Sequence, residues 1–145
     1  MNARVDPHFA ERIRGSFGRQ QAMALIGASL ATVAPGVVEI ALPFRDDLTQ
    51  QKGFIHGGII GMIADSACGY AAYSLMPADC SLVTVEYKIN LLAPATASLV
   101  ARGAVVKSGR TLSITRGEVY AADGTQVALM QQTLMTLPGR SDHPE

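Results

Sequence analysis

Several features that mark common protein classes are missing from this sequence. Only two of its 145 residues are cysteines, Cys68 and Cys80, and only 17% are charged. Two cysteines at this separation form neither a disulfide framework nor a CxxC motif, so we expect both to be ordinary buried thiols. A chain that uses cysteine in this way is expected in the cytoplasm.

An excess of either charge is also missing. The 12 lysines and arginines balance the 12 aspartates and glutamates, which gives a formal net charge of +0. Because nucleic acids and anionic membranes attract basic surfaces, we expect neither as a partner. Residues 1–6 contain no apolar core followed by a cleavage site, so they do not predict a secretory signal. Metal-ligand spacings, a G-x-S-x-G motif and a phosphate-binding loop are absent, so no metal is expected.

The sequence does contain one long uncharged run, residues 57–76, in which Asp65 is the single charged residue. Its length is compatible with a membrane span, but the central aspartate and the lack of flanking cations or an aromatic belt argue against one. A helix that is apolar on all sides is normally buried in a core, and Pro77 would end it. Burying a lone carboxylate is expensive. Asp65 therefore indicates a functional role more strongly than a structural one, in which it would bind backbone groups, Ser66 or Tyr70.

The remaining residues predict helix first and then mostly strands. Asp6-Pro7 is suited to open a helix, and apolar residues at four-residue spacing give that helix one buried edge. A second helical piece is expected at 20–25, ending at Gly27. Strands are expected at 28–33, 37–42, 81–92, 98–106, 111–122 and 125–136, with a hairpin turn at Asp123-Gly124 and a frayed tail at 138–145.

These elements predict one α+β domain over residues 1–145, with an N-terminal helical segment at 1–27. In strand 81–92, alternation places Val83, Val85, Tyr87, Ile89 and Leu91 on one face and Thr84, Glu86, Lys88 and Asn90 on the other. Successive strands with short loops imply an antiparallel sheet, whose concave face would hold the long helix. One sheet cannot cover that helix completely, so we expect a second copy of the chain to help.

His56, Gly57 and Gly58 stand where the long helix would begin. The first N–H groups of a helix lack partners and lie at its positive end, and glycine allows close approach. Such a start suits a developing oxyanion, although a bare HGG is also typical of a plain turn. Asp65 follows Gly57 after about 12 Å of helix. A reacting carbonyl must lie about 3 Å from both groups, so a two-fold dimer with antiparallel helices is needed if both act.

These motifs, in this order, resemble the hotdog-fold acyl-CoA thioesterases, in particular the subgroup related to phenylacetate degradation. The resemblance covers roughly residues 36–137. It consists of His56-Gly57-Gly58, Asp65 after six intervening residues, Thr84 to Ala95, Gly109-Arg110-Thr111 and Asp123-Gly124. It implies an antiparallel sheet wrapped around a long helix, and hydrolysis of an acyl-CoA thioester to a free acid and coenzyme A. Coenzyme A is then part of the substrate, and no separate cofactor is implied.

The resemblance also implies roles for individual residues. The N–H of Gly57 or Gly58 would polarise the thioester carbonyl, and Asp65 would activate water or attack directly. His56 would help to shape the loop.

Further positions that resemble the family either match it less closely or lie outside the helix. Thr84 matches a residue that binds the water together with the aspartate, and its alternative is an ordinary strand residue. Gln50 stands where the family often has asparagine, one methylene shorter. The resemblance implies contact with the nucleotide of coenzyme A for the turn Lys107, Ser108, Gly109, Arg110 and Thr111, whose cations and N–H groups suit phosphate.

Two other functions stay open at this point. The chain could be an acyl-thioester dehydratase or hydratase of the same fold, using His56 and Asp65 on the carbon chain, or it could bind acyl-CoA without turnover. The acyl group is not identified, and both aryl and medium-chain groups remain open. Phe54, Ile59, Met62 and Ile63 are expected to line the pocket between subunits. A homodimer is expected from the helix geometry, and a pair of dimers from the resemblance.

Overall fold

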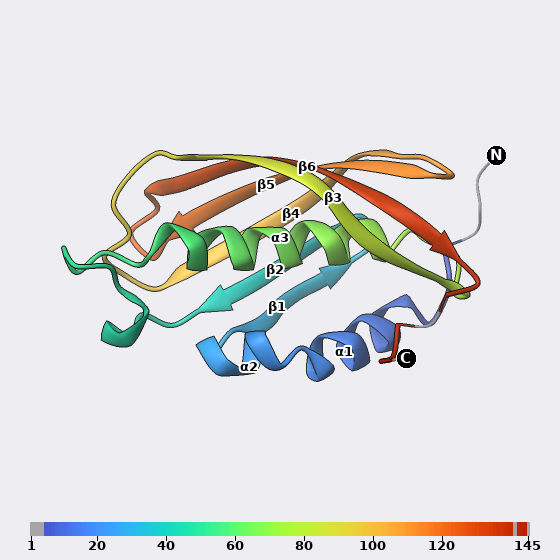
Figure 1. Ribbon diagram of the computed structural model, residues 1–145, viewed down its shortest axis with the longest axis horizontal. Helices are drawn as coiled ribbons and strands as arrows, with labels where there is room; N and C mark the ends of the chain where they lie inside the picture. The colour runs from blue at the N-terminus through green and yellow to red at the C-terminus, as the bar shows by residue number, and fades with distance from the viewer. Residues whose placement is uncertain (1–4, 141, 145) are drawn as a thin grey trace.

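The computed structural model describes residues 5–140 and 142–144, and shows a long helix lying against one curled sheet (Figure 1). The helices are α1 (Phe9–Arg19), α2 (Gln21–Ile26) and α3 (Gly57–Tyr73), with a 3-10 turn η1 (Asp46–Leu48) before α3. The strands are β1 (Ser29–Ala34), β2 (Val37–Leu42), β3 (Cys80–Leu91), β4 (Leu99–Ser108), β5 (Leu112–Ala121) and β6 (Gln126–Pro138). The six strands form one antiparallel sheet in the order β1-β2-β4-β5-β6-β3. The predicted α+β class, with an antiparallel sheet around a long helix, is confirmed.

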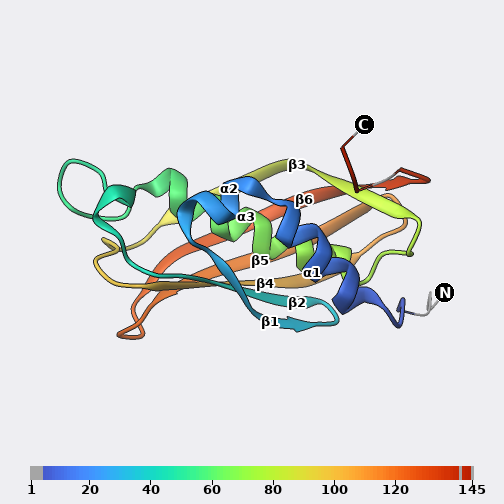
Figure 2. The same cartoon turned by 90° about the horizontal axis from the view of Figure 1, so that it is seen from below.

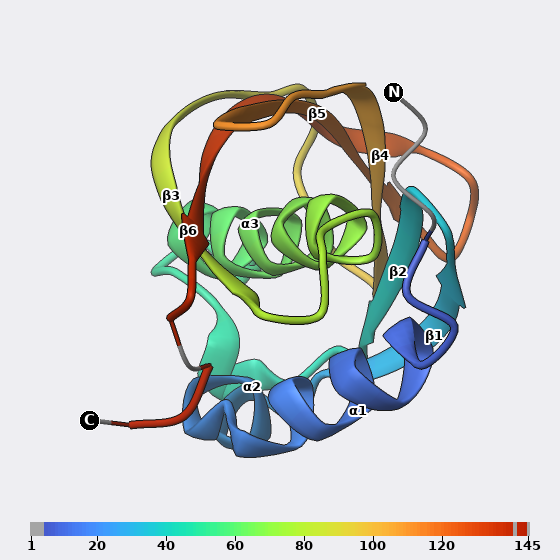
Figure 3. The same cartoon turned by 90° about the vertical axis from the view of Figure 1, so that its right-hand side faces the viewer.

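α3 lies in the concave face of the sheet, as the end-on view makes clear (Figure 3). Gly103 on β4 pairs with Gly117 on β5, and together they let the helix backbone approach the strands. A Cβ atom on Gly103 would lie 2.4 Å from the carbonyl carbon of Ala67 and 2.5 Å from the backbone nitrogen of Cys68. The position of α3 against the sheet therefore depends on the missing side chain at Gly103.

α1 and α2 cover the side of α3 that the sheet leaves open (Figures 2 and 3). Arg12 on α1 donates hydrogen bonds to the carbonyl oxygens of Pro77, Tyr73 and Met76 at 2.8, 3.1 and 3.1 Å. Its guanidinium carbon also lies 4.3 Å from the centre of the Tyr73 ring. A cation at the end of a helix satisfies carbonyls that have no helical partner. Arg12 thus fixes the helical layer to the end of α3.

The first helix begins later than predicted. Asp6 is not its N-cap; the Asp6 carboxylate accepts a hydrogen bond from the backbone N–H of His8 at 3.0 Å, and α1 starts at Phe9. Pro7 consequently lies in the turn before the helix. α2 ends as predicted at Gly27, whose φ of 77° is the left-handed conformation that favours glycine.

β3 lies at the edge of the sheet, beside β6 and not beside β4. The predicted antiparallel pairing is correct, but the chain crosses from one edge of the sheet to its middle between β3 and β4. One side of the β3 backbone therefore has no partner strand in the described part of the chain. No helix in that part is long and apolar enough to cross a membrane.

A β-bulge in β3 overturns the predicted alternation of this strand. The pairing with β6 shifts between Thr84 and Glu86, which leaves Val85 as an extra residue. An extra residue exchanges the two faces of the strand beyond it. As a result Thr84 reaches Asp65 on α3, and the hydroxyl of Tyr87 lies over the same helix. Strict alternation had placed Thr84 and Tyr87 on opposite faces.

Candidate active site

Asp65, midway along α3, is held by donors from two strands. The hydroxyl of Thr84 on β3 donates to Asp65 Oδ1 at 2.8 Å, and the side-chain amide of Gln132 on β6 donates to the same oxygen at 2.5 Å. Gln132 also donates to the Thr84 hydroxyl oxygen at 2.8 Å. The three side chains form a closed triangle. Asp65 Oδ2 accepts no hydrogen bond from any described residue, so one carboxylate oxygen is fixed and the other is available.

Gln132 is a residue of this site that the sequence patterns did not predict. Its side chain is 1% exposed, and its Oε1 has no hydrogen-bond partner among the described residues. A buried carbonyl without a partner is unfavourable, so the buried position of this amide is explained by the two hydrogen bonds that its NH2 group donates. Rotating the amide would set Oε1 against the Asp65 carboxylate. The sequence does contain a signal for this residue, because Gln131 and Gln132 are adjacent in a mostly apolar strand. Successive side chains of a strand point to opposite faces, so one of the two glutamines must point into the core.

His56 forms the N-cap of α3. Its ring Nδ1 accepts a hydrogen bond from the N–H of Gly58 at 2.8 Å, which requires an unprotonated Nδ1. The N–H of Gly57 has no partner among the described residues. At the positive end of the helix dipole, Gly57 and not Gly58 therefore presents the available donor.

Gln50 lies in the turn that leads into α3. Its side-chain Oε1 accepts from the backbone N–H of Lys52, so the side chain supports the turn. Within one chain the predicted residues thus fall into two groups. Asp65 and Thr84 meet halfway along α3, while four others lie at or before its start: Gln50, His56, Gly57 and Gly58. Of these, Gly57 is about 12 Å from Asp65 along the helix axis.

The turn predicted to contact the coenzyme A nucleotide joins β4 to β5. Its first and last residues are exposed and its glycine is half-buried. The N–H of Gly109 donates to the carbonyl oxygen of Leu112 at 2.9 Å and closes the turn. Figure 1 shows this turn at the end of the molecule where α3 ends, opposite the end where α3 begins. Within one chain, residues 107–111 therefore lie far from Gly57.

A cavity of about 180 Å³ opens beside Asp65, between α1, α3 and β3. Its walls include Ser16, Gln20, Ser66, Tyr70, Tyr73 and Leu82. The four residues predicted to line an acyl pocket between subunits do not line this cavity within one chain, and Ile63 is fully buried in the core. The reason is their position: Phe54, Ile59, Met62 and Ile63 precede Asp65, whereas the cavity follows the second half of α3.

Both cysteines are buried free thiols, as predicted. Burial raises the pKa of the Cys68 thiol to about 12, and the nearby Asp65 charge acts in the same direction. Such a thiol is a poor nucleophile and a poor metal ligand at neutral pH. Among residues 5–140 and 142–144, no group of three His, Cys, Asp or Glu side chains is placed to hold a metal ion.

The unpaired edge of β3 is apolar as well as long. Val83, Val85 and Tyr87 are 43%, 55% and 45% exposed, and Leu91 and Leu92 are 54% and 53% exposed. A long apolar edge strand is a surface that proteins normally cover.

Comparison with known proteins places this arrangement in a family. The family model described as the thioesterase superfamily matches residues 52–128. A solved thioesterase family protein from Silicibacter pomeroyi is 47% identical, with a TM-score of 0.87, and the match covers 90% of this chain and 99% of that one. An archaeal protein from Saccharolobus solfataricus, whose name classes it provisionally as an esterase, is 30% identical over 105 residues, which span 72% of this chain and 74% of that protein.

A further solved structure supports the fold alone. The Escherichia coli PaaI protein from the phenylacetic acid degradation operon has a TM-score of 0.86 at 18% identity, and the match covers 94% of this chain and 98% of that one. The sheet that wraps α3 is thus the hotdog fold that the motifs around Asp65 predicted. With its family match over residues 52–128, this chain belongs to the thioesterase superfamily.

Proposed function

We propose that this protein hydrolyses an acyl-CoA thioester to a free acid and coenzyme A. One observation carries the proposal: Asp65 lines a cavity and keeps one carboxylate oxygen without a hydrogen bond from the described residues, while Thr84 and Gln132 fix the other oxygen. A carboxylate oriented in this way is suited to general-base or nucleophilic catalysis. Membership of the thioesterase superfamily supports a thioester as the bond that is broken.

In the proposed reaction, Asp65 Oδ2 removes a proton from water as the water oxygen bonds to the thioester carbon. The carbonyl oxygen gains negative charge and accepts a hydrogen bond from the N–H of Gly57. When the carbon–sulfur bond breaks, the thiolate of coenzyme A takes the proton from Asp65. Direct attack by Oδ2 on the carbonyl, followed by hydrolysis of the anhydride, uses the same oxygen and the same N–H.

The two groups must come from different subunits, because Gly57 and Asp65 of one helix are about 12 Å apart along its axis. The exposed edge of β3 supports a dimer in which two copies pair antiparallel through this strand. Thr84 marks the level of Asp65 on β3, and Leu91 marks that of Gly57, whose Cβ position lies 2.6 Å from Leu91 Cδ1. The site is complete when Thr84 faces Leu91 of the partner subunit.

The same dimer gives the β4–β5 turn a function. Because this turn lies at the end of the molecule where α3 ends, it comes near the start of the partner's α3. Lys107 and Arg110, both exposed, then lie on the side from which a bound coenzyme A would extend, and their charges suit its phosphates. We further propose that two such dimers associate.

A substrate screen tests the proposed function directly. Short-, medium- and long-chain acyl-CoA and aryl-CoA compounds would be incubated with the protein, and free coenzyme A would be measured with a thiol reagent. Asp65→Asn should lower kcat by about 100-fold or more and leave the folded structure intact. Full activity in this variant would disprove the assignment. Hydration of an enoyl-CoA, or binding without turnover across the panel, would favour the two alternative functions.

Mixing inactive variants tests whether the site is shared. Gly57 is the first residue of α3, where proline is well tolerated and removes only the N–H. Gly57→Ala keeps the N–H but crowds Leu91 in the same way. Gly57→Pro should therefore reduce kcat by about 100-fold more than Gly57→Ala does.

The shared site also predicts complementation. A mixed dimer of Asp65→Asn and Gly57→Pro chains contains one site with both groups intact. An equal mixture that exchanges subunits freely should recover about a quarter of wild-type activity. No recovery, despite mixed dimers detected by mass spectrometry, would show that each chain uses its own Gly57 and Asp65.

A further inference from the structure

The cavity beside Asp65 ends at an ion pair from the two ends of the chain. Asp142 and Tyr73 both line this cavity, and Tyr73 lies eight residues beyond Asp65 on α3, about 12 Å along the helix axis. The Arg19 guanidinium on α1 donates to Asp142 Oδ2 at 3.0 Å and approaches the Asp142 carbonyl oxygen at 3.5 Å. The ion pair therefore ties the C-terminal segment to α1 at the point where the cavity stops.

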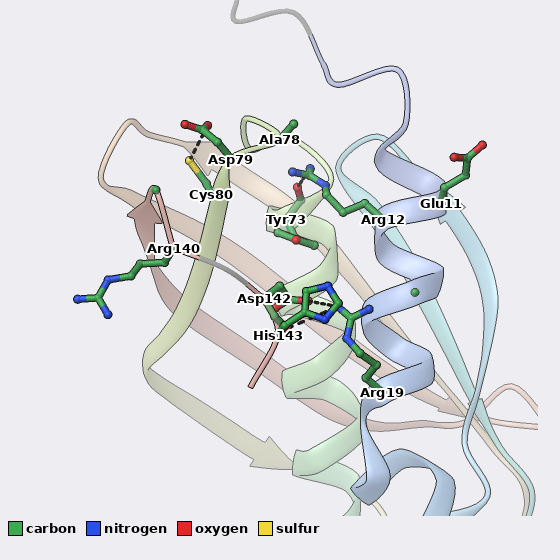
Figure 4. Close-up of a pocket in the computed structure, with 12 residues that line it drawn as sticks. Glu11, Arg12, Arg19, Tyr73, Ala78, Asp79, Cys80, Arg140, Asp142 and His143 are labelled. Atoms are coloured by element: carbon green, nitrogen blue, oxygen red, sulfur yellow. Dashed lines mark hydrogen bonds and ion pairs between the residues drawn. The ribbon is translucent and has the colours of Figure 1, made fainter. Parts of the chain in front are cut away.

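A second and larger cavity begins on the other side of this ion pair. It has a volume of about 470 Å³, and Arg19, Tyr73 and Asp142 all line it (Figure 4). Tyr73 and Asp142 thus belong to the walls of both cavities. Figure 4 shows Asp142 and Arg19 side by side between α1 and α3.

The side wall of the smaller cavity is fixed by hydrogen bonds. The Tyr70 hydroxyl accepts from the Gln20 amide at 2.8 Å and lies 3.0 Å from the Ser16 hydroxyl, while Ser66 donates to Gln20 Oε1 at 3.3 Å. Four side chains that hold one another in this way cannot move aside independently. The length of group that the cavity accepts is therefore decided at its end and not along its side.

We propose that the Arg19–Asp142 ion pair, with Tyr73, is the end wall of the acyl subsite and limits the length of the acyl group. The proposal rests on the proposed function, because the thioester carbon must lie next to Asp65 and its acyl group then enters the cavity. The volume of about 180 Å³ is close to the roughly 150 Å³ of a cavity that takes benzene. The subsite thus accepts one six-membered ring or a short chain, and a long chain meets the ion pair.

Removing the ion pair joins the two cavities. Both partners are partly exposed, at 38% and 31% of their side-chain surface, so breaking the pair has little effect on folding. The ratio of kcat/KM for dodecanoyl-CoA to that for hexanoyl-CoA should rise by about tenfold or more in Arg19→Ala and in Asp142→Ala, since each newly buried methylene is worth roughly fourfold in binding. Arg14→Ala is the matched control, because Arg14 lies exposed on the same helix and lines neither cavity.

A charge exchange separates the ion pair from the loss of side-chain volume. The double variant Arg19→Asp with Asp142→Arg should return the ratio toward the wild-type value. A ratio within about twofold of wild type in both alanine variants, or an equal rise in Arg14→Ala, would overturn the proposal. A wild-type protein that already prefers dodecanoyl-CoA would also overturn it.

Binding of the free acids keeps this test apart from that of the proposed function. The affinities for hexanoate and dodecanoate would be measured by calorimetry for the same variants, with the same expected change in their ratio. Absence of hydrolysis by the wild type would disprove the proposed function alone. An unchanged affinity ratio in the alanine variants would disprove the end wall alone.

Discussion

Replacing Gln132 with methionine separates its role in the site from its role in the core. Methionine has a similar length but no hydrogen to donate, so Asp65 Oδ1 loses the bond at 2.5 Å and Thr84 loses the bond at 2.8 Å. A hydrogen bond to a charged group contributes about 1.5–3 kcal/mol, which corresponds to roughly 10- to 100-fold in rate if the oriented carboxylate is needed in the transition state. The proposed function therefore predicts a fall of this size in kcat.

The same substitution should change stability much less. It removes two hydrogen bonds, but it also removes Oε1, a buried acceptor without a partner among the described residues. These effects oppose each other, so we expect the free energy of unfolding to change by no more than about 1 kcal/mol. A large fall in kcat with a small change in stability is a combination that a purely structural residue does not produce.

The assay is coenzyme A release at saturating substrate, with urea unfolding measured on the same samples. Gln131→Met is the matched control, because Gln131 is the exposed neighbour on the same strand. Turnover by Gln132→Met within about twofold of wild type would refute the reasoning, whatever its stability.

Three further predictions concern the fold that carries the site. Gly103→Ala should destabilise the protein by about 3 kcal/mol or more in urea unfolding, because the new Cβ meets the backbone of Ala67 at 2.4 Å. Gly18 in α1 has open space around it, so the control variant Gly18→Ala should instead stabilise the protein by up to about 1 kcal/mol. Because burial raises the pKa of Cys68 to about 12 from 9.0, the thiol stays protonated in the fold while it ionises in the unfolded chain. The free energy of unfolding should consequently fall between about pH 9 and pH 12, and Cys68→Ala should lose that part of the pH dependence. Arg12→Met should cost about 1.5–3 kcal/mol through its three carbonyl contacts at the end of α3, and equal melting temperatures for the two proteins would argue against the capping role.

Much of the fold was readable from the sequence because its signals are local. A run of apolar residues with one carboxylate predicts a buried helix, and alternation bounded by glycine, proline and Asp-Gly predicts strands. The N–H group without a partner at the start of α3 was predicted for the same reason, since the position where a helix begins is set by the residues at that position. Local signals also explain the errors. The position of β3 beside β6 depends on pairings between distant segments, and the bulge at Val85 depends on the partner strand, so alternation alone placed Thr84 and Tyr87 on opposite faces.

The sequence by itself determined that Asp65 is a lone carboxylate in a buried helix, about 12 Å from the nearest suitable oxyanion donor. Both follow from residue type and helical rise, which need no tertiary structure. Tertiary structure alone decided how Asp65 is held. Gln132 is far from Asp65 in sequence, and only the folding of β6 beside β3 brings its amide to the carboxylate. The hydrogen bond from the Gly58 N–H to His56 Nδ1 likewise leaves the Gly57 N–H as the available donor. The orientation of the His56 side chain is fixed by the folded loop and does not follow from the motif.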